Sequence, residues 1–228
     1  MSHPFRIAQG DVTLHANFTE PAFASLRDVT PLFKALFERL NRFGLRLSDV
    51  KLEKGDGSLG EANVFCSLYH LSTTVRVRLD AVEIACYDTV RFNQQQFVDI
   101  ARSSLEAVSR TLTNNPYKTY AVTANLHGAV EGMTTQDFLA RTAGKGPTNL
   151  GPLLASGAVF YYGAEAERLT SFLNVDLSGA KAGAVYVRTH IVFDAAKASL
   201  NDLPTLTENY LRTAFESLEL DWPVLPPT

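Results

Sequence analysis

The sequence predicts an α+β protein in which antiparallel strands carry long amphipathic helices on one face. Two patterns predict this class. Apolar and polar residues alternate over short segments such as 11–19, which is typical of strands with one buried face. Other segments, such as 93–112, place apolar residues three and four positions apart, which indicates amphipathic helices.

The order of the expected elements predicts an internal duplication. The series strand, helix, three or four antiparallel strands, long helix occurs twice, and the opening strands share residue types (VTLHAN at 12–17, VTANLH at 122–127). We therefore expect two similar β-α-β-β-β-α halves, 1–115 and 116–220, related by a pseudo-twofold axis and followed by a proline-rich tail at 221–228. The alternative is one irregular α+β domain whose halves look alike by chance.

The first half opens with the strand at 11–19 and continues into a well-marked helix. Thr30 can serve as its N-cap, Pro31 fits its first position, and Gly44 can end it in a left-handed conformation. These signals predict an amphipathic helix between Thr30 and Gly44.

A run of short strands follows over residues 48–88. The apolar positions change parity near Asp80-Ala81, which predicts a tight turn or a bulge there. The long helix over 93–112 then ends at the polar cluster Asn114-Asn115-Pro116.

The second half repeats this order. A strand over 119–131 precedes a short helix, for which Thr134 is the expected N-cap and Asp137 completes a capping-box pattern. A loop rich in glycine and proline covers 144–152. The remaining expected elements are three strands and a helix, at 157–163, 169–177, 184–194 and 204–220.

Composition bounds the function classes. Of 228 residues, 46% are apolar and 20% charged, as in ordinary globular proteins. Residues 1–113 hold 13 basic and 13 acidic side chains, and residues 114–228 hold 8 and 11, so neither half has the basic excess that nucleic-acid binding requires. With no apolar run of membrane-spanning length and no secretory leader pattern, we expect a cytoplasmic protein that binds neither membrane nor nucleic acid.

Motifs for metals, cofactors and covalent catalysis are missing from the sequence. The five histidines do not fall at metal-ligand spacing, and no CxxC or GxSxG pattern occurs. Cys66 and Cys86 share the apolar parity of their strands, which predicts buried, reduced and unreactive thiols. We expect no metal and no cofactor.

The candidate contact residues on the opening strands are polar. His15 and Asn17 lie on the polar side of the first strand, and Asn125 and His127 lie on the polar side of its counterpart. If these strands adjoin, the two imidazoles can approach one another and form a ligand-contacting patch. The alternative is that all four are solvated residues on the wet face of a sheet.

A second group of candidates is cationic. Arg76 and Arg78 share one strand face, and Arg188 and His190 occupy a comparable face in the second half. Together they can line a surface that binds carboxylates or phosphates. The alternative is the ordinary solvent side of a two-faced strand.

Two apolar segments are candidate protein contacts. Residues 158–162 (AVFYY), with Tyr161, are apolar on both faces, which suits either a covered central strand or an interface. Trp222 and the prolines after it form an extended tail that can pack on its own domain or dock into another chain. These segments predict self-association, most simply as a homodimer.

Together the residues favour a non-enzymatic, soluble binding or assembly module that acts through protein–protein contacts. The first alternative is a carrier or sensor that binds a small apolar or anionic ligand in a cavity between the sheet and the helices, for which we expect a pocket beside helix 93–112. The second alternative is an enzyme that uses scattered carboxylates with His190 or His127.

Overall fold

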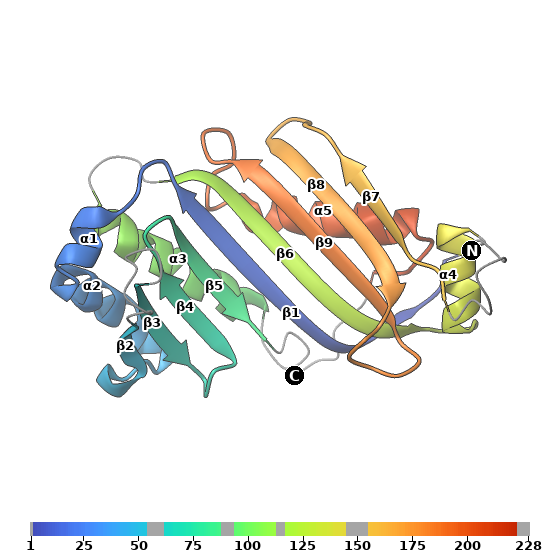
Figure 1. Cartoon of the computed structure of the whole chain (residues 1–228), viewed down its shortest axis with the longest axis horizontal. Coiled ribbons are helices and arrows are strands. Elements are labelled where there is room, and N and C mark those ends of the chain that lie inside the picture. Colours follow the sequence, from blue (N-terminus) through green and yellow to red (C-terminus); the bar gives the residue numbers. More distant parts are fainter. Residues whose placement is uncertain (1, 54–61, 88–93, 113–116, 145–154, 223–228) are drawn as a thin grey trace.

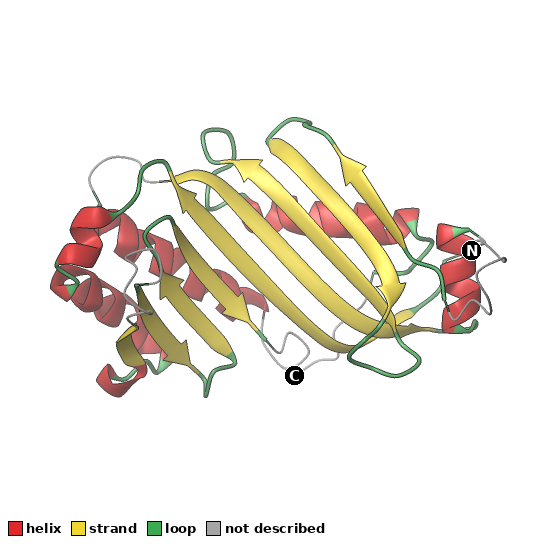
Figure 2. Ribbon diagram, in the orientation of Figure 1, coloured by secondary structure: helices red, strands yellow, loops and turns green. Residues whose placement is uncertain are grey.

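The computed structural model describes residues 2–53, 62–87, 94–112, 117–144 and 155–222. In that part of the chain nine strands form a single antiparallel sheet (Figures 1 and 2). The strands are β1 (Phe5–Phe18), β2 (Val50–Glu53), β3 (Asn63–Leu68), β4 (Thr73–Val77), β5 (Ala81–Cys86), β6 (Tyr117–Val130), β7 (Ala158–Tyr162), β8 (Arg168–Leu177) and β9 (Val185–Asp194). The sheet order is β2-β3-β4-β5-β1-β6-β9-β8-β7.

The two longest strands, β1 and β6, lie side by side at the centre of the sheet (Figure 1). Their antiparallel register places Thr13 opposite Thr123. From β1 towards one edge the order is β5, β4, β3 and β2, and from β6 towards the other edge it is β9, β8 and β7. Each group therefore begins with its first strand at the centre and continues outward through its remaining strands in reverse chain order.

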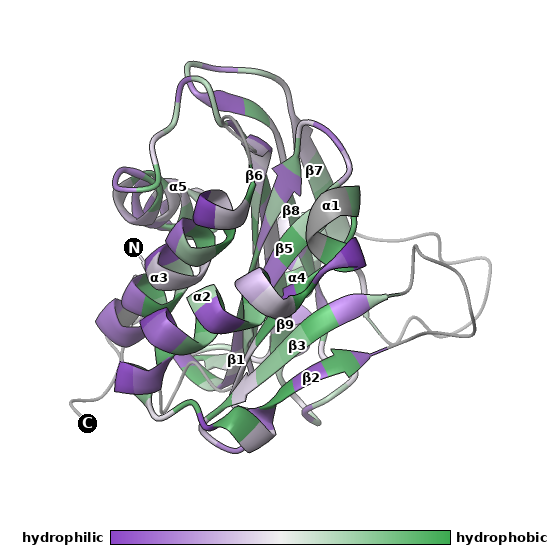
Figure 3. Ribbon diagram, turned by 90° about the vertical axis from the view of Figure 1, so that its left-hand side faces the viewer, coloured by the Kyte–Doolittle hydropathy of each residue, from purple (hydrophilic) through white to green (hydrophobic). Residues whose placement is uncertain are grey.

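Helices cover one face of the sheet. They are α1 (Phe23–Arg27), α2 (Thr30–Leu40), α3 (Gln94–Thr111), α4 (Thr135–Ala143) and α5 (Leu203–Ser217), with short 3-10 turns η1 (Asn41–Phe43) and η2 (Leu47–Asp49). Figure 3 shows α2, α3 and α5 on the same side of the sheet. We call this side the helix face and the opposite side the open face.

The first core cluster lies between the helix face and helices α2 and α3. Leu32, Leu36 and Leu40 of α2 are buried there, as the helical spacing predicts. The end of α2 runs through η1 to Gly44, which has a positive φ of 84°. Its start differs from expectation: Val29 occupies the N-cap, and Thr30 is the first helical residue.

A second core cluster lies between β6, β8, β9 and helices α4 and α5. The Phe5 ring of β1 meets the Phe215 ring of α5 edge to face, with 5.4 Å between centroids. Gly128 of β6 makes room for this contact. A Cβ atom there would lie 2.6 Å from both the Phe5 ring and the Arg6 carbonyl oxygen, so only glycine fits.

The sequence expectations can be compared with these elements. The α+β class and the antiparallel sheet are confirmed. Strand β1 begins six residues before the expected start at residue 11. The turn near Asp80-Ala81 is confirmed, because β4 ends at Val77, β5 begins at Ala81, and the Arg78 N–H donates to the Ala81 carbonyl over 2.8 Å. The Thr134 cap is also confirmed, since its hydroxyl accepts from the Asp137 N–H.

Three further expectations concern burial and boundaries. Cys66 and Cys86 are buried, as expected, and burial raises the pKa of the Cys66 thiol to about 12. The expected boundary between residues 115 and 116, almost all of the 144–152 loop and residues 223–228 of the tail lie outside the described residues. No helix in the described ranges is both long and apolar enough to cross a lipid bilayer.

Candidate functional site

The open face gathers nearly all of the candidate contact residues. Strand parity and register place nine of the ten on it, namely His15, Asn17, Arg76, Arg78, Asn125, His127, Tyr161, Arg188 and His190. Eight of the nine belong to two clusters, one around Glu83 and one around Phe172, whereas Asn17 contacts Thr119. Trp222 lies elsewhere.

The first cluster, which we call the β5 cluster, surrounds Glu83. Arg76 and Arg78 each approach this carboxylate, at 3.4 and 3.3 Å. His15 Nδ1 lies 4.0 Å from Glu83 Oε2, the oxygen that Arg78 also approaches. Glu53 of β2 lies 4.0 Å from Arg76, so two carboxylates balance the two guanidinium groups of the cluster.

His15 is held in its neutral form by its surroundings. Burial lowers its pKa, and the positive charge of Arg78 lowers it further, while Glu83 and Asp80 act in the opposite direction. At neutral pH the imidazole is therefore an uncharged hydrogen-bonding group.

The second cluster, which we call the β9 cluster, is built on Phe172 of β8. The His190 ring stacks on the Phe172 ring with 5.2 Å between centroids, and the Arg188 guanidinium lies 5.2 Å from the same ring. Thr123 Oγ1 lies 2.8 Å from His190 Nδ1. Within the described residues Arg188 has no carboxylate at ion-pair distance, and its Nε is buried without a hydrogen-bond partner.

A chain of polar contacts extends the β9 cluster towards the centre of the sheet. Tyr186 donates its hydroxyl hydrogen to Asn125 Oδ1 over 2.7 Å, and Asn125 Nδ2 donates to Asp11 over 2.6 Å. The His127 ring stacks on Tyr186, and its Nδ1 lies 2.8 Å from the Ser178 hydroxyl oxygen. These contacts fix the orientation of the side chains before any partner binds.

In the β9 cluster Arg188 carries a positive charge, and Asp11, at the end of its chain of polar contacts, carries a negative one. Burial lowers the pKa of His190, and Arg188 and then His15 lower it further. At neutral pH this imidazole is therefore an uncharged hydrogen-bonding group.

The expected approach of His15 to His127 does not occur. Strands β1 and β6 do adjoin, but their antiparallel register places His15 opposite Ala121 and His127 opposite Gln9. Six residues separate the two positions along β6, which corresponds to about 20 Å of strand. Asn17 instead donates to Thr119 Oγ1 across the same strand pair, over 2.9 Å.

Strand β7 lies at an edge of the sheet, not in its centre. Its side chains are exposed in both directions, with exposed fractions of 47% for Val159, 36% for Phe160, 79% for Tyr161 and 39% for Tyr162. Because consecutive residues of a strand point to opposite faces, exposure of all four indicates an uncovered edge. Of the two expectations for 158–162, the covered central strand is wrong.

Trp222 packs on its own chain. Its ring meets Phe215 of α5 edge to face at 5.5 Å, and the Arg212 guanidinium lies 5.2 Å from its centroid. The first of the two expectations for the tail is therefore confirmed for Trp222.

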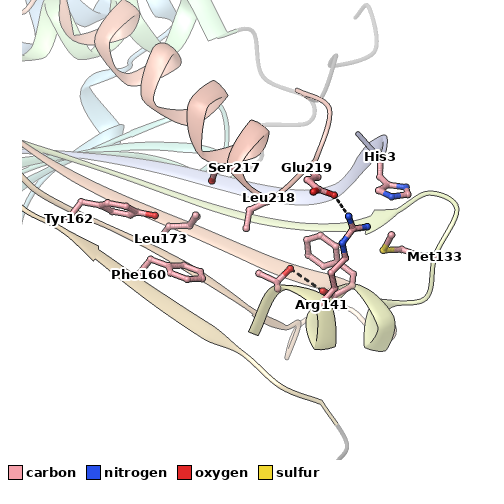
Figure 4. A pocket seen from close by; sticks show the side chains of 11 residues that line it. His3, Met133, Arg141, Phe160, Tyr162, Leu173, Ser217, Leu218 and Glu219 are labelled. Carbon is pink, nitrogen blue, oxygen red and sulfur yellow. Dashed lines mark hydrogen bonds and ion pairs between the residues drawn. The ribbon is translucent and has the colours of Figure 1, made fainter. Parts of the chain in front are cut away.

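A cavity of about 300 Å³ lies on the helix face at the far end of the second half (Figure 4). It is bounded by α4, by β7 and β8, and by the residues that follow α5, so it does not adjoin the 93–112 helix, where a cavity was expected. The lining residues are His3, Met133, Phe138, Arg141, Thr142, Phe160, Tyr162, Leu173, Ser217, Leu218 and Glu219.

The sequence did not predict that Glu83 and Phe172 would be at the centres of the two clusters. The alternation of strand positions does place both residues on the same face as the arginines, so part of the signal was present. The missing information was the register, which alone decides that Phe172 lies beside His190. No alternation or spacing pattern in the sequence predicts the cavity, because its position depends on where α4 and α5 end.

The two clusters contain ion pairs, hydrogen bonds and ring contacts. In the described part of the chain no group of three or more histidine, cysteine, aspartate or glutamate side chains is arranged to hold a metal ion. The Ser178 hydroxyl beside His127 accepts from the N–H groups of Ala180 and Lys181, as in a side-chain-stabilised turn.

Neither family models nor curated protein sequences give a match to this chain.

Proposed function

We propose that the protein is a non-enzymatic assembly module that acts through protein–protein contacts and pairs with a second copy of itself along β7. The observation that carries this proposal is the exposure of β7 on both faces at an edge of the sheet. A strand added beside β7 would cover Tyr161 on the open face and Phe160 and Tyr162 on the helix face.

The two edges of the sheet support this choice of surface. Sheet proteins protect their edges with charged residues, proline or bulges. Strand β2 reads VKLE and carries Lys51 and Glu53, whereas β7 reads AVFYY and carries no charge and no proline. The β7 edge is therefore the unprotected one.

A second copy is a chemically suitable occupant. Antiparallel pairing of β7 with β7 uses the same residues on both copies and closes with twofold symmetry. It places valine and aromatic side chains opposite one another without opposing like charges, and such cross-strand pairs contribute about 0.2–1 kcal/mol each. Because the strand is short, we expect a dissociation constant in the micromolar range, or about 8 kcal/mol.

Sedimentation equilibrium tests this proposal. We expect wild-type protein to be dimeric at tens of micromolar, and Tyr161→Lys to be monomeric at the same concentration because a lysine ammonium would lose its hydration within an apolar contact. Leu47→Lys is the matched control, since Leu47 of η2 is 73% exposed and remote from β7 in the sheet order, and this variant should remain dimeric. A monomeric wild type, or a dimeric Tyr161→Lys, would contradict the proposal.

The internal duplication belongs to the same proposal. It is supported by the outward strand order, which is β1, β5, β4, β3 in one group and β6, β9, β8, β7 in the other, with β2 as an addition to the first. A twofold axis between Thr13 and Thr123 would relate the two groups. Sequence profiles of homologues should then align residues 12–17 with 122–127, and profiles without that match would count against the duplication.

We also propose that the protein acts in the cytoplasm, without nucleic acid or membrane as a partner. The near-balanced charge of both halves supports the exclusion of nucleic acid, and the lack of a membrane-spanning helix among the described residues is compatible with the exclusion of a membrane. An electrophoretic mobility assay at low salt should show no shift of single- or double-stranded DNA or RNA. A salt-sensitive shift would overturn that exclusion.

A further inference from the structure

The cavity on the helix face has a wall of apolar side chains. Phe160 and Tyr162 extend into it from β7, and Leu173 reaches it from β8 (Figure 4). The other apolar contributors are Met133, Phe138 and Leu218. Two partly exposed aromatic rings beside a buried leucine form a surface that gains free energy when another apolar group covers it.

The charged groups at the cavity cancel one another. Arg141 of α4 and Glu219, which follows α5, form an ion pair beside His3 (Figure 4). The pair carries no net charge, and its side chains are 55% and 50% exposed, so solvent screens it. It therefore gives an ionic ligand no uncompensated charge to bind, and the apolar wall favours a neutral ligand.

The hydroxyl groups of Thr142 and Ser217 at the cavity have only acceptor positions to offer. Thr142 donates its hydroxyl hydrogen to the Phe138 carbonyl over 3.0 Å, and Ser217 donates to the Ala214 carbonyl over 2.7 Å. A hydroxyl has one hydrogen and two lone pairs, so each oxygen can still accept a bond. A ligand that satisfies them must bring a donor.

The volume limits the size of the ligand. About 300 Å³ is at the lower end of the range for small-molecule sites. A one- or two-ring molecule fits such a space, whereas a long acyl chain or a nucleotide does not.

We propose that this cavity is a binding site for a small, neutral aromatic molecule with one hydrogen-bond donor. Its rings pack against Phe160 and Tyr162, and its donor reaches Ser217 or Thr142. The site shares Phe160 and Tyr162 with the proposed pairing surface along β7, whereas Tyr161 lies on the open face and does not line the cavity, so Tyr161→Lys tests the pairing alone.

Titration of 5-fluoroindole followed by ¹⁹F NMR tests the proposal on the full chain. Indole is used as a probe because it is neutral, has two rings and carries one N–H donor. We expect saturable broadening or shift of the fluorine signal. N-methylation of the probe, which removes the donor, should weaken binding about three- to tenfold, and a carboxylate on the ring should abolish detectable binding.

Two variants on α5 locate the binding site. Ser217→Phe places a ring in the cavity and should weaken binding of 5-fluoroindole at least about tenfold, because the space is then filled. Thr213→Phe is the control, since Thr213 is also exposed, donates to a helix carbonyl (Asn209) and does not line the cavity. Absence of saturable binding, equal effects of the two variants, or preference for the carboxylate probe would overturn the proposal.

Discussion

The two edge strands of the sheet differ in the charge of their side chains. Edge strand β2 carries Lys51 and Glu53, and in the β5 cluster Arg76 and Arg78 form ion pairs with Glu83. Edge strand β7 carries uncharged aromatic residues, and in the neighbouring β9 cluster Arg188 has no carboxylate at ion-pair distance among the described residues. The same outward order of strands thus ends in a protected edge on one side and an unprotected edge on the other.

The order of the strands alone therefore does not identify a contact surface. The first group of strands is covered by α2 and α3 and contains the larger core cluster, whereas the second leaves both the β7 edge and a cavity uncovered. We therefore expect substitutions in the first half to act mainly on stability, and those at the β7 edge to act mainly on binding.

Core truncation should show the largest effect. Leu36→Ala in α2 removes a fully buried side chain from the first core cluster and should lower the free energy of unfolding by about 3–5 kcal/mol. Leu173→Ala should cost about 2–3 kcal/mol, because one side of Leu173 already borders the cavity and makes fewer contacts. Urea denaturation measures both, and a larger loss for Leu173→Ala would reverse the proposed contrast.

Substitution of Gly128 should have the next largest effect. In Gly128→Ala the new methyl group would collide with the Phe5 ring and with the Arg6 carbonyl oxygen, one of which is backbone and cannot turn away. We expect a loss of about 1–3 kcal/mol in the free energy of unfolding. The control is Gly163→Ala, which meets no atom within 4 Å and should be close to neutral.

The charge clusters should respond differently to neutral substitutions. Glu83→Gln leaves Arg76 and Arg78 without the carboxylate they share, and we expect a loss of about 1–2 kcal/mol in the free energy of unfolding, since both guanidinium groups are partly solvated. The same change should lower the pKa of His15 further, because Glu83 acts to raise it. Arg188→Gln should cost less than Glu83→Gln, and the opposite order would show that Arg188 has a structural role.

The smallest expected effect is on the pH dependence of stability. The pKa of His190 is lowered in the folded chain, first by burial and then by Arg188, so the unfolded chain takes up a proton more readily as the pH falls below about 6.5. His190 therefore contributes stability above that pH that is lost progressively below it. His190→Asn should flatten the fall in melting temperature between pH 7 and pH 5, and an unchanged slope in this variant would contradict the contribution of His190.

The fold was more predictable from the sequence than the site. Period-two alternation identified the strands, and apolar spacing identified α2, α3 and α5, because both patterns depend only on neighbouring residues. The pairing of β1 with β6 decides which open-face side chains meet, and it depends on residues more than one hundred positions apart. The sequence accordingly placed His15 and His127 on the correct strands but could not show that the antiparallel register separates them.

The edge position of β7 also could not be predicted from the sequence. Residues 158–162 are apolar at every position, which suits a covered central strand as well as an interface, and only the strand order distinguishes the two. Trp222 was ambiguous for the same reason, since its packing depends on Phe215 of α5.

The spacing between two copies tests the central claim, pairing along β7, most directly. Spin labels attached to Thr170→Cys on β8 react selectively, because the native Cys66 and Cys86 are buried. In a dimer joined through β7, three strand spacings and a short offset along the strands place the two labels about 20–30 Å apart, within range of double electron–electron resonance. The account predicts a narrow distribution at that separation. Absence of dipolar coupling at tens of micromolar, or a comparable short distance between labels at Leu52→Cys on β2, would contradict it.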